Sequence, residues 1–160
     1  RTPVVTSRAM DERAGRALSI GAGDGAFLVI DASELGAINR QFGMEWHDDA
    51  LRHVSTAIAG AVRSTDLVGC TGMDSFGVFL AGASEAEAVE VGERIRVSVE
   101  NSYFAPDGVR HMIEVNIAGV TFADDLSFNE LYVQATQALE QPDARTTMAV
   151  IKADAAVMKA

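Results

Sequence analysis

The sequence predicts an α/β fold in which a mixed central β-sheet, one part of it a β-hairpin, is flanked by helices. The first observation is a continuous apolar run at 26–30, which has the length and the β-forming residues of a central strand buried on both faces. The second is that amphipathic helical stretches alternate with β-rich segments along the chain. Strand–helix–strand crossovers pair strands in parallel and a hairpin pairs them antiparallel, so the sheet is expected to be mixed.

Turn residues and helix caps divide the chain into these elements. The glycines within 21–25 end the first helix, and Gly43 ends the second. Ser33 and Ser84 are predicted N-caps, because a serine hydroxyl accepts from the free N–H groups of a first helical turn. Trp46 lies on the apolar stripe of the third helix and is predicted to be in the core. In chain order the predicted elements are a helix over 7–20, a strand over 26–30, helices over 33–42 and 45–62, a β-hairpin with strands 67–72 and 76–81 around a turn at 73–75, a helix that follows Ser84, a turn at 106–108, a strand over 112–122, a helix over 127–141 and a strand over 147–151.

Composition and charge restrict the class of protein. A chain of 160 residues that is 48% apolar and 22% charged suits one globular domain. The formal net charge of −10 opposes binding to nucleic acid or to an anionic membrane, since both favour a basic surface. Cys70 is the only cysteine and the longest apolar run is too short to cross a bilayer, so we expect a cytoplasmic module. Because the first residue is Arg1, we also expect the chain to be part of a longer protein.

Several landmarks follow one another at fixed spacing between residues 31 and 80. They are, in order, Asp31, Ile38-Asn39, Gly43, Asp48, Arg63-Ser64-Thr65-Asp66 and Gly72-Met73-Asp74-Ser75-Phe76. This stretch resembles the GGDEF family of diguanylate cyclases, whose fold is related to the nucleotidyl cyclases and the polymerase palm. The resemblance implies a GGDEF domain over 23–152, after an N-terminal linker helix at 1–22 and before a C-terminal tail at 153–160.

Several positions depart from what the resemblance implies for an active cyclase. Active members align two GTP molecules across a dimer, with metal ions that bridge the phosphates. The second acidic residue of the hairpin is here Ser75, which cannot act as a carboxylate ligand. The second glycine is Met73, whose side chain would crowd a phosphate, and the phosphate-binding lysines correspond to Gly36 and Asp143. We therefore expect a degenerate domain that does not make cyclic di-GMP.

Four positions of the nucleotide site keep the residue types that the resemblance implies. Asn39 and Asp48 occupy the positions that recognise guanine, where the aspartate would accept from N1–H and N2–H2. An alternative is that both residues are helix-end caps. Asp31 and Asp74 occupy positions of metal-binding carboxylates, and they either hold Mg²⁺ weakly or are polar residues at strand ends. No cofactor is expected, and Mg²⁺ is expected only if GTP binds.

Arg63 and Asp66 form an Arg-x-x-Asp pair shortly before the hairpin. The resemblance implies that this pair is the inhibitory site, which binds cyclic di-GMP away from the active site. Arginine can donate two hydrogen bonds to O6 and N7 of guanine, and aspartate accepts from the Watson–Crick edge. Arg94 on the following helix is the expected second arginine, since Arg96 lies about 200° further around that helix. The alternative is an ordinary i,i+3 surface salt bridge, worth a few tenths of a kcal/mol.

These observations predict an enzymatically inactive cyclic di-GMP receptor that controls a partner protein or an adjacent domain. The alternative is a GTP-sensing domain without cyclase turnover, and a third interpretation is a structural module that binds no nucleotide. A homodimer remains open. The three histidines, His47, His53 and His111, share no spacing with Cys70 that is typical of a zinc site.

Overall fold

The helices and strands follow the predicted order, with one short additional strand near the N-terminus. The computed structural model describes residues 3–20, 23–123, 126–140 and 146–150. The elements are β1 (Val4–Val5), α1 (Ser7–Ser19), β2 (Gly25–Asp31), α2 (Leu35–Phe42), α3 (Met44–Ala61), β3 (Leu67–Gly72), β4 (Ser75–Ala81), α4 (Glu85–Glu100), β5 (Asn116–Phe122), α5 (Phe128–Leu139) and β6 (Thr146–Val150).

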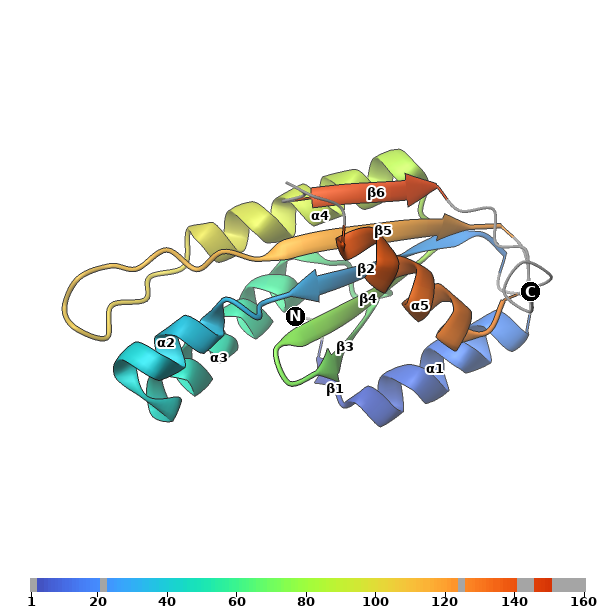
Figure 1. Ribbon diagram of the computed structural model, residues 1–160. Coiled ribbons are helices and arrows are strands. Elements are labelled where there is room, and N and C mark those ends of the chain that lie inside the picture. Colours follow the sequence, from blue (N-terminus) through green and yellow to red (C-terminus); the bar gives the residue numbers. More distant parts are fainter. Residues whose placement is uncertain (1–2, 21–22, 124–125, 141–145, 151–160) are drawn as a thin grey trace.

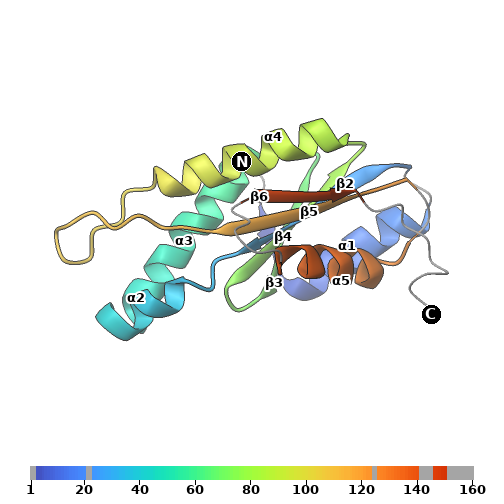
Figure 2. The same cartoon turned by 45° about the horizontal axis from the view of Figure 1, so that its top comes forward.

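The strands form one mixed sheet with helices on both faces. The strand order is β1-β3-β4-β2-β5-β6, in which β1–β3 and β5–β6 are parallel pairs and the other three are antiparallel. Helices α3 and α4 cover one face, and α1 and α5 cover the other (Figure 1 and Figure 2). The predicted mixed α/β fold, with β3 and β4 as its hairpin, is confirmed. None of the helices within the described ranges is long and apolar enough to cross a membrane.

Strand β2 lies at the centre of the sheet because both of its faces are apolar. Ala26, Leu28 and Ile30 pack into the core beneath α3 and α4. Phe27 and Val29 point to the opposite face and pack with α1 and α5. Each large side chain that is fully buried contributes about 1.5–3 kcal/mol, so this strand holds the two layers together. The prediction of a strand buried on both faces is confirmed.

Helix α4 begins where its capping residues predict. The Ser84 hydroxyl accepts from the backbone N–H of Glu87, and the Glu87 carboxylate accepts from the Ser84 N–H. The latter hydrogen bond is the main reason why the pKa of Glu87 lies below its usual value. The apolar residues of its inner stripe are buried, namely Ala88, Val91, Ile95 and Val99.

The start of helix α2 differs from the prediction. The helix begins at Leu35 with Glu34 as N-cap, and no side chain caps it. Ser33 instead donates its backbone N–H to Oδ1 of Asp31, so its expected capping role is wrong. Gly43 both ends α2 and starts α3, and its φ of 98° is a conformation that glycine adopts without strain.

Helix α1 is part of the domain core, whereas the sequence indicates a linker helix at 1–22. Met10, Ala14 and Leu18 are buried on the inner face of α1, against the sheet and α5. The preceding strand β1 pairs with β3. The apolar stripe of this helix is narrow and most of its residues are polar. For this reason the sequence favours a linker helix.

Two further differences concern the periphery of the core. Trp46, predicted to be in the core, is 36% exposed, and its ring lies edge-on to Phe104 with a centroid distance of 6.1 Å. The predicted strand over 112–122 is a strand only from Asn116, where pairing with β2 begins. The predicted tail at 153–160 and Asp143 lie outside the described residues.

Candidate functional site

The sheet register brings the residues of the predicted nucleotide site to one end of the central strands. Asp31 at the end of β2 lies opposite Ser75 of β4 on one side and opposite Asn116 of β5 on the other. The carbonyl of Asp74 in the hairpin accepts from the backbone N–H of Ala32 at 2.7 Å. The two predicted metal-binding positions, Asp31 and Asp74, therefore lie at the same edge of the sheet.

A histidine that the sequence analysis left aside lies between two of the predicted site residues. His47 in the first turn of α3 is only 6% exposed. Its Nε2 is 2.9 Å from Oδ1 of Asp74, and its Nδ1 is 3.5 Å from Oδ1 of Asp48. Oδ1 of Asp74 is buried without a hydrogen-bond partner, so the short contact with His47 is close but not aligned as a hydrogen bond.

The helical periodicity of α3 indicates that His47 is buried. His47 precedes Ala50 by three residues and Val54 by seven, and both of these are fully buried. It therefore lies on the inner stripe of α3, and Trp46 lies at the edge of that stripe. The large apolar side chain of Trp46 made it the predicted core residue, although the helical period indicates that the imidazole is the more buried of the two.

The residues at this edge do not fit a two-metal centre. The Oδ1 atom of Asp31 accepts from the N–H of Ser33 at 2.8 Å. The hydroxyl of Ser75 accepts from Oγ1 of Thr71 at 3.0 Å and supplies no charge. Within the described ranges, no group of three or more His, Cys, Asp or Glu residues is arranged to hold a metal ion. Mg²⁺ favours several oxygen ligands in octahedral geometry, which this arrangement does not provide.

The predicted guanine-recognising residues lie on neighbouring helices and are not caps. Asn39 is within α2, and its backbone carbonyl accepts from the N–H of Gly43. Asp48 is within α3, and its side chain is 61% exposed. Neither residue is at an N-cap or C-cap position, so the alternative interpretation as helix-end caps is wrong. A Cβ at Gly36, also in α2, would lie 3.4 Å from Nη1 of Arg40, which places a cation near the position of the missing lysine.

Arg63 and Asp66 close the turn that connects α3 to β3. The carboxylate of Asp66 accepts from the backbone N–H of Arg63 at 2.8 Å and from its Nη2 at 2.8 Å. Hydrogen bonding to Asp66, supported by its charge, raises the pKa of Arg63. The Asp66 side chain is 0% exposed, whereas that of Arg63 is 47% exposed. The pair is therefore more than a surface salt bridge, because one partner is buried and bound to backbone as well.

Arg94 and Arg96 point in different directions from α4, as the helical spacing predicts. Nε of Arg94 donates to the carbonyl of Ala61, the last residue of α3, at 2.7 Å. This contact brings Arg94 close to the turn that contains Arg63. Arg96 instead pairs with Glu93 and Glu100 of its own helix, at 2.8 and 2.9 Å. Arg94 is thus bound to the C-terminal end of α3, two residues before Arg63, where free carbonyls favour cations.

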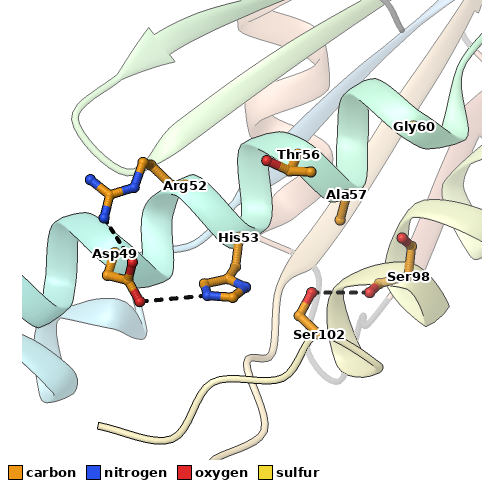
Figure 3. A pocket seen from close by; sticks show the side chains of 8 residues that line it. All are labelled: Asp49, Arg52, His53, Thr56, Ala57, Gly60, Ser98 and Ser102. Atoms are coloured by element: carbon orange, nitrogen blue, oxygen red, sulfur yellow. Dashed lines mark hydrogen bonds and ion pairs between the residues drawn. The ribbon is translucent and has the colours of Figure 1, made fainter.

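A groove of about 540 Å³ runs between α3 and α4 beside this point. Its lining includes Thr56 and Gly60 from α3 and Ser98 from α4 (Figure 3). At one end Asp49 pairs with Arg52 at 2.7 Å and with His53 at 3.5 Å. His53 therefore lines the groove, about 120° around α3 from His47. The sequence contains no signal for this groove, because the groove depends on how two helices cross.

The family model described as "Diguanylate cyclase, GGDEF domain" matches residues 2–148. The chain belongs to the GGDEF family. This membership relates it to cyclic di-GMP metabolism and confirms the predicted family. Diguanylate cyclase DosC of Escherichia coli K12 is 34% identical over 113 residues, which are 70% of this chain and 25% of DosC. Response regulator PleD of Caulobacter vibrioides is 34% identical over 91 residues, which are 57% of this chain and 20% of PleD. This GGDEF chain thus spans a quarter or less of these relatives.

Solved GGDEF structures have the same fold. The GGDEF domain of TpbB, also called YfiN, from Pseudomonas aeruginosa is 26% identical with a TM-score of 0.81, covering 93% of this chain and 91% of that one. The GGDEF domain of DgcB from Caulobacter crescentus, in complex with c-di-GMP, is 18% identical with a TM-score of 0.79, covering 92% of each chain. At 18% identity the likeness to DgcB concerns the fold alone.

Proposed function

We propose that this GGDEF domain is a receptor that binds cyclic di-GMP at Arg63 and Arg94 and does not synthesise it. The observation that supports this most directly is the hydrogen bond from Arg94 to the carbonyl of Ala61, which ties Arg94 to the end of α3 two residues before Arg63. Cyclic di-GMP presents anionic phosphates and guanine edges, and a guanidinium can donate paired hydrogen bonds to either.

Protein contacts already hold both arginines in place. Asp66 and, at 3.4 Å, the carbonyl of Ala81 accept from Nη2 of Arg63. Arg94 is held by the carbonyl of Ala61. Side chains that are already oriented lose less entropy when a ligand binds, which favours affinity. In this proposal Asp66 is a positioning residue, because its side chain is 0% exposed and its carboxylate accepts from Arg63.

The proposed lack of synthesis rests on the hairpin and its surroundings. Met73 at the tip is 85% exposed and stands where a bare backbone would have to approach phosphate. Ser75 replaces a carboxylate, and Asp74 faces His47. Phosphoryl transfer depends on metal ions that neutralise the developing charge, and these residues do not provide for them.

Calorimetric titration with cyclic di-GMP tests the receptor proposal. Arg63→Ala should weaken binding by about 30- to 150-fold, equivalent to about 2–3 kcal/mol, because a charge-assisted pair of hydrogen bonds is lost. Arg94→Ala should also weaken binding. Arg96→Ala is the matched control on the same helix and should bind like the wild type, since its partners are Glu93 and Glu100.

Two further controls make the titration specific. Substitutions of Asn39 and Asp48 should leave cyclic di-GMP binding unchanged, because they lie at the other end of α3 or on α2. Thermal unfolding of each variant must be recorded, since Arg63→Ala leaves the buried Asp66 without its main partner. A wild-type affinity weaker than millimolar, or an intact Arg63→Ala variant that binds as well as the wild type, would refute the proposal.

A further inference from the structure

The nucleotide site differs from the proposed receptor site in that one of the protein's own side chains lies within it. The imidazole of His47 lies between Asp48, at a predicted guanine-recognising position, and Asp74, at a predicted metal-binding position. The distances of 3.5 and 2.9 Å leave no room for another group between the ring and either carboxylate. At 6% exposure, the ring is almost completely covered by protein.

We infer that His47 is the residue that determines nucleotide access to this site, and that its imidazole excludes GTP·Mg²⁺ from it. The inference goes beyond the proposed function, since it concerns GTP and the opposite end of α3 and holds whether or not cyclic di-GMP binds. The residues here fit the imidazole and not a metal ion, because the one remaining hairpin carboxylate already faces Nε2 at 2.9 Å.

The position of His47 in the fold explains how one ring can close the site. The backbone of His47 is in the first turn of α3, where its N–H donates to the carbonyl of Gly43. Asp74 is in the turn between β3 and β4, which is fastened to the end of β2 through Ala32. The ring therefore bridges a helix and the hairpin. A nucleotide that contacts both Asp48 and Asp74 would have to enter between these two elements. Both supports are hydrogen-bonded backbone, which holds the two elements that the ring joins.

The removal of the imidazole is the direct test. GTP with Mg²⁺ is titrated into the wild type, His47→Ala and His53→Ala, and binding is measured by calorimetry. We expect His47→Ala to bind GTP at least about tenfold more tightly than the wild type, and His53→Ala to match the wild type. His53 is a matched control, because it is a histidine of the same helix that faces Asp49 in the groove beside α4 (Figure 3). Adding Asp48→Ala to His47→Ala should abolish the gain.

Equal GTP affinity in folded wild type and His47→Ala would overturn the inference. Cyclic di-GMP binding should be the same in both, so failure of the receptor proposal and failure of this inference give different results. If His47→Ala does not fold, carbethoxylation of the histidines in the wild type is the alternative test of whether His47 is accessible. The reagent should modify His53 and His111, whose side chains are 33% and 32% exposed, and spare His47, whose side chain is 8% exposed. Millimolar GTP·Mg²⁺ should not change this pattern, and modification of His47 at the rate of the other two would overturn the inference.

Discussion

At the scale of single residues, Asp66 combines two properties that the sequence does not reveal. It follows an exposed turn, yet its side chain is 0% exposed and accepts from the backbone and the guanidinium of Arg63. A buried carboxylate is stable only when such donors surround it. Asp66 therefore stabilises the α3–β3 connection whether or not Arg63 also contacts a ligand.

Replacing Asp66 by asparagine should lower the free energy of unfolding by about 1.5–3 kcal/mol, because an amide has a single acceptor oxygen and its NH₂ group would face the donors of Arg63. Urea denaturation of the wild type and Asp66→Asn measures the difference. Asp11→Asn, at an exposed position of α1, is the control and should stay within about 0.5 kcal/mol of the wild type. A similarly small effect for Asp66→Asn would mean that the pair with Arg63 does not stabilise the fold.

At the scale of elements, two glycines differ in whether the surrounding atoms leave room for a side chain. A Cβ at Gly60 in α3 would have no atom within 4 Å, since this glycine faces the groove beside α4. A Cβ at Gly25 in β2 would lie 2.6 Å from the carbonyl oxygen of Leu80 and 2.9 Å from the ring of Phe122. Both glycines are in regular secondary structure, but only Gly60 has space for a methyl group. Replacement by alanine should therefore have opposite effects on stability at the two positions.

Gly60→Ala should raise the free energy of unfolding by about 0.5–1 kcal/mol, because alanine restricts the unfolded chain and favours the helix. Gly25→Ala should lower it by about 1–3 kcal/mol, because backbone atoms must shift to accept the methyl group. Urea denaturation of the two variants and the wild type is the measurement. The same sign of change at both positions would contradict the packing described for β2.

Features with local causes could be predicted from the sequence, and this covers most of the fold. The apolar run of β2, the serine cap of α4 and the glycine after α2 each specify their element through neighbouring residues. The predicted start of α2 at Ser33 is wrong, because the backbone N–H of Ser33 donates to Asp31 and its side chain does not cap the helix. The core position of α1 was also missed, because its apolar stripe consists of only Met10, Ala14 and Leu18.

The arrangement of the candidate site depends on contacts between distant residues. The helical count correctly separated Arg94 from Arg96, but the contact of Arg94 with Ala61 joins residues on two helices. His47 and Asp74 meet only because α3 packs beside the hairpin turn. Single-sequence periodicity indicates which face of a helix is buried, and it does not indicate which residue of another element that face meets.

On the scale of the whole molecule, the chain has the GGDEF fold, and we propose that the reaction centre of this fold is altered here. We predict that the chain will not convert GTP to cyclic di-GMP with Mg²⁺ or Mn²⁺, even at high protein concentration. Ser75 removes a carboxylate, Met73 obstructs the hairpin tip and His47 faces Asp74, so the metal ions that would align and neutralise the phosphates lack ligands. Chromatography of the nucleotides after incubation is the measurement. Product clearly above a control without protein would contradict the prediction.

Restoring the glycine and the carboxylate of the hairpin tests whether these two residues alone prevent turnover or whether other positions also prevent it. The double variant Met73→Gly/Ser75→Glu should remain inactive, because His47 still occupies the space beside Asp74 and Gly36 still lacks a lysine. Arg40 near Gly36 supplies one cation on α2, but it leaves the imidazole beside Asp74 in place. Diguanylate cyclase DosC, assayed in parallel, is the positive control. Activity in the double variant would show that the hairpin alone prevents turnover. Activity that appears only after His47→Ala is added would assign the block to the imidazole, because the double and triple variants differ in that ring alone.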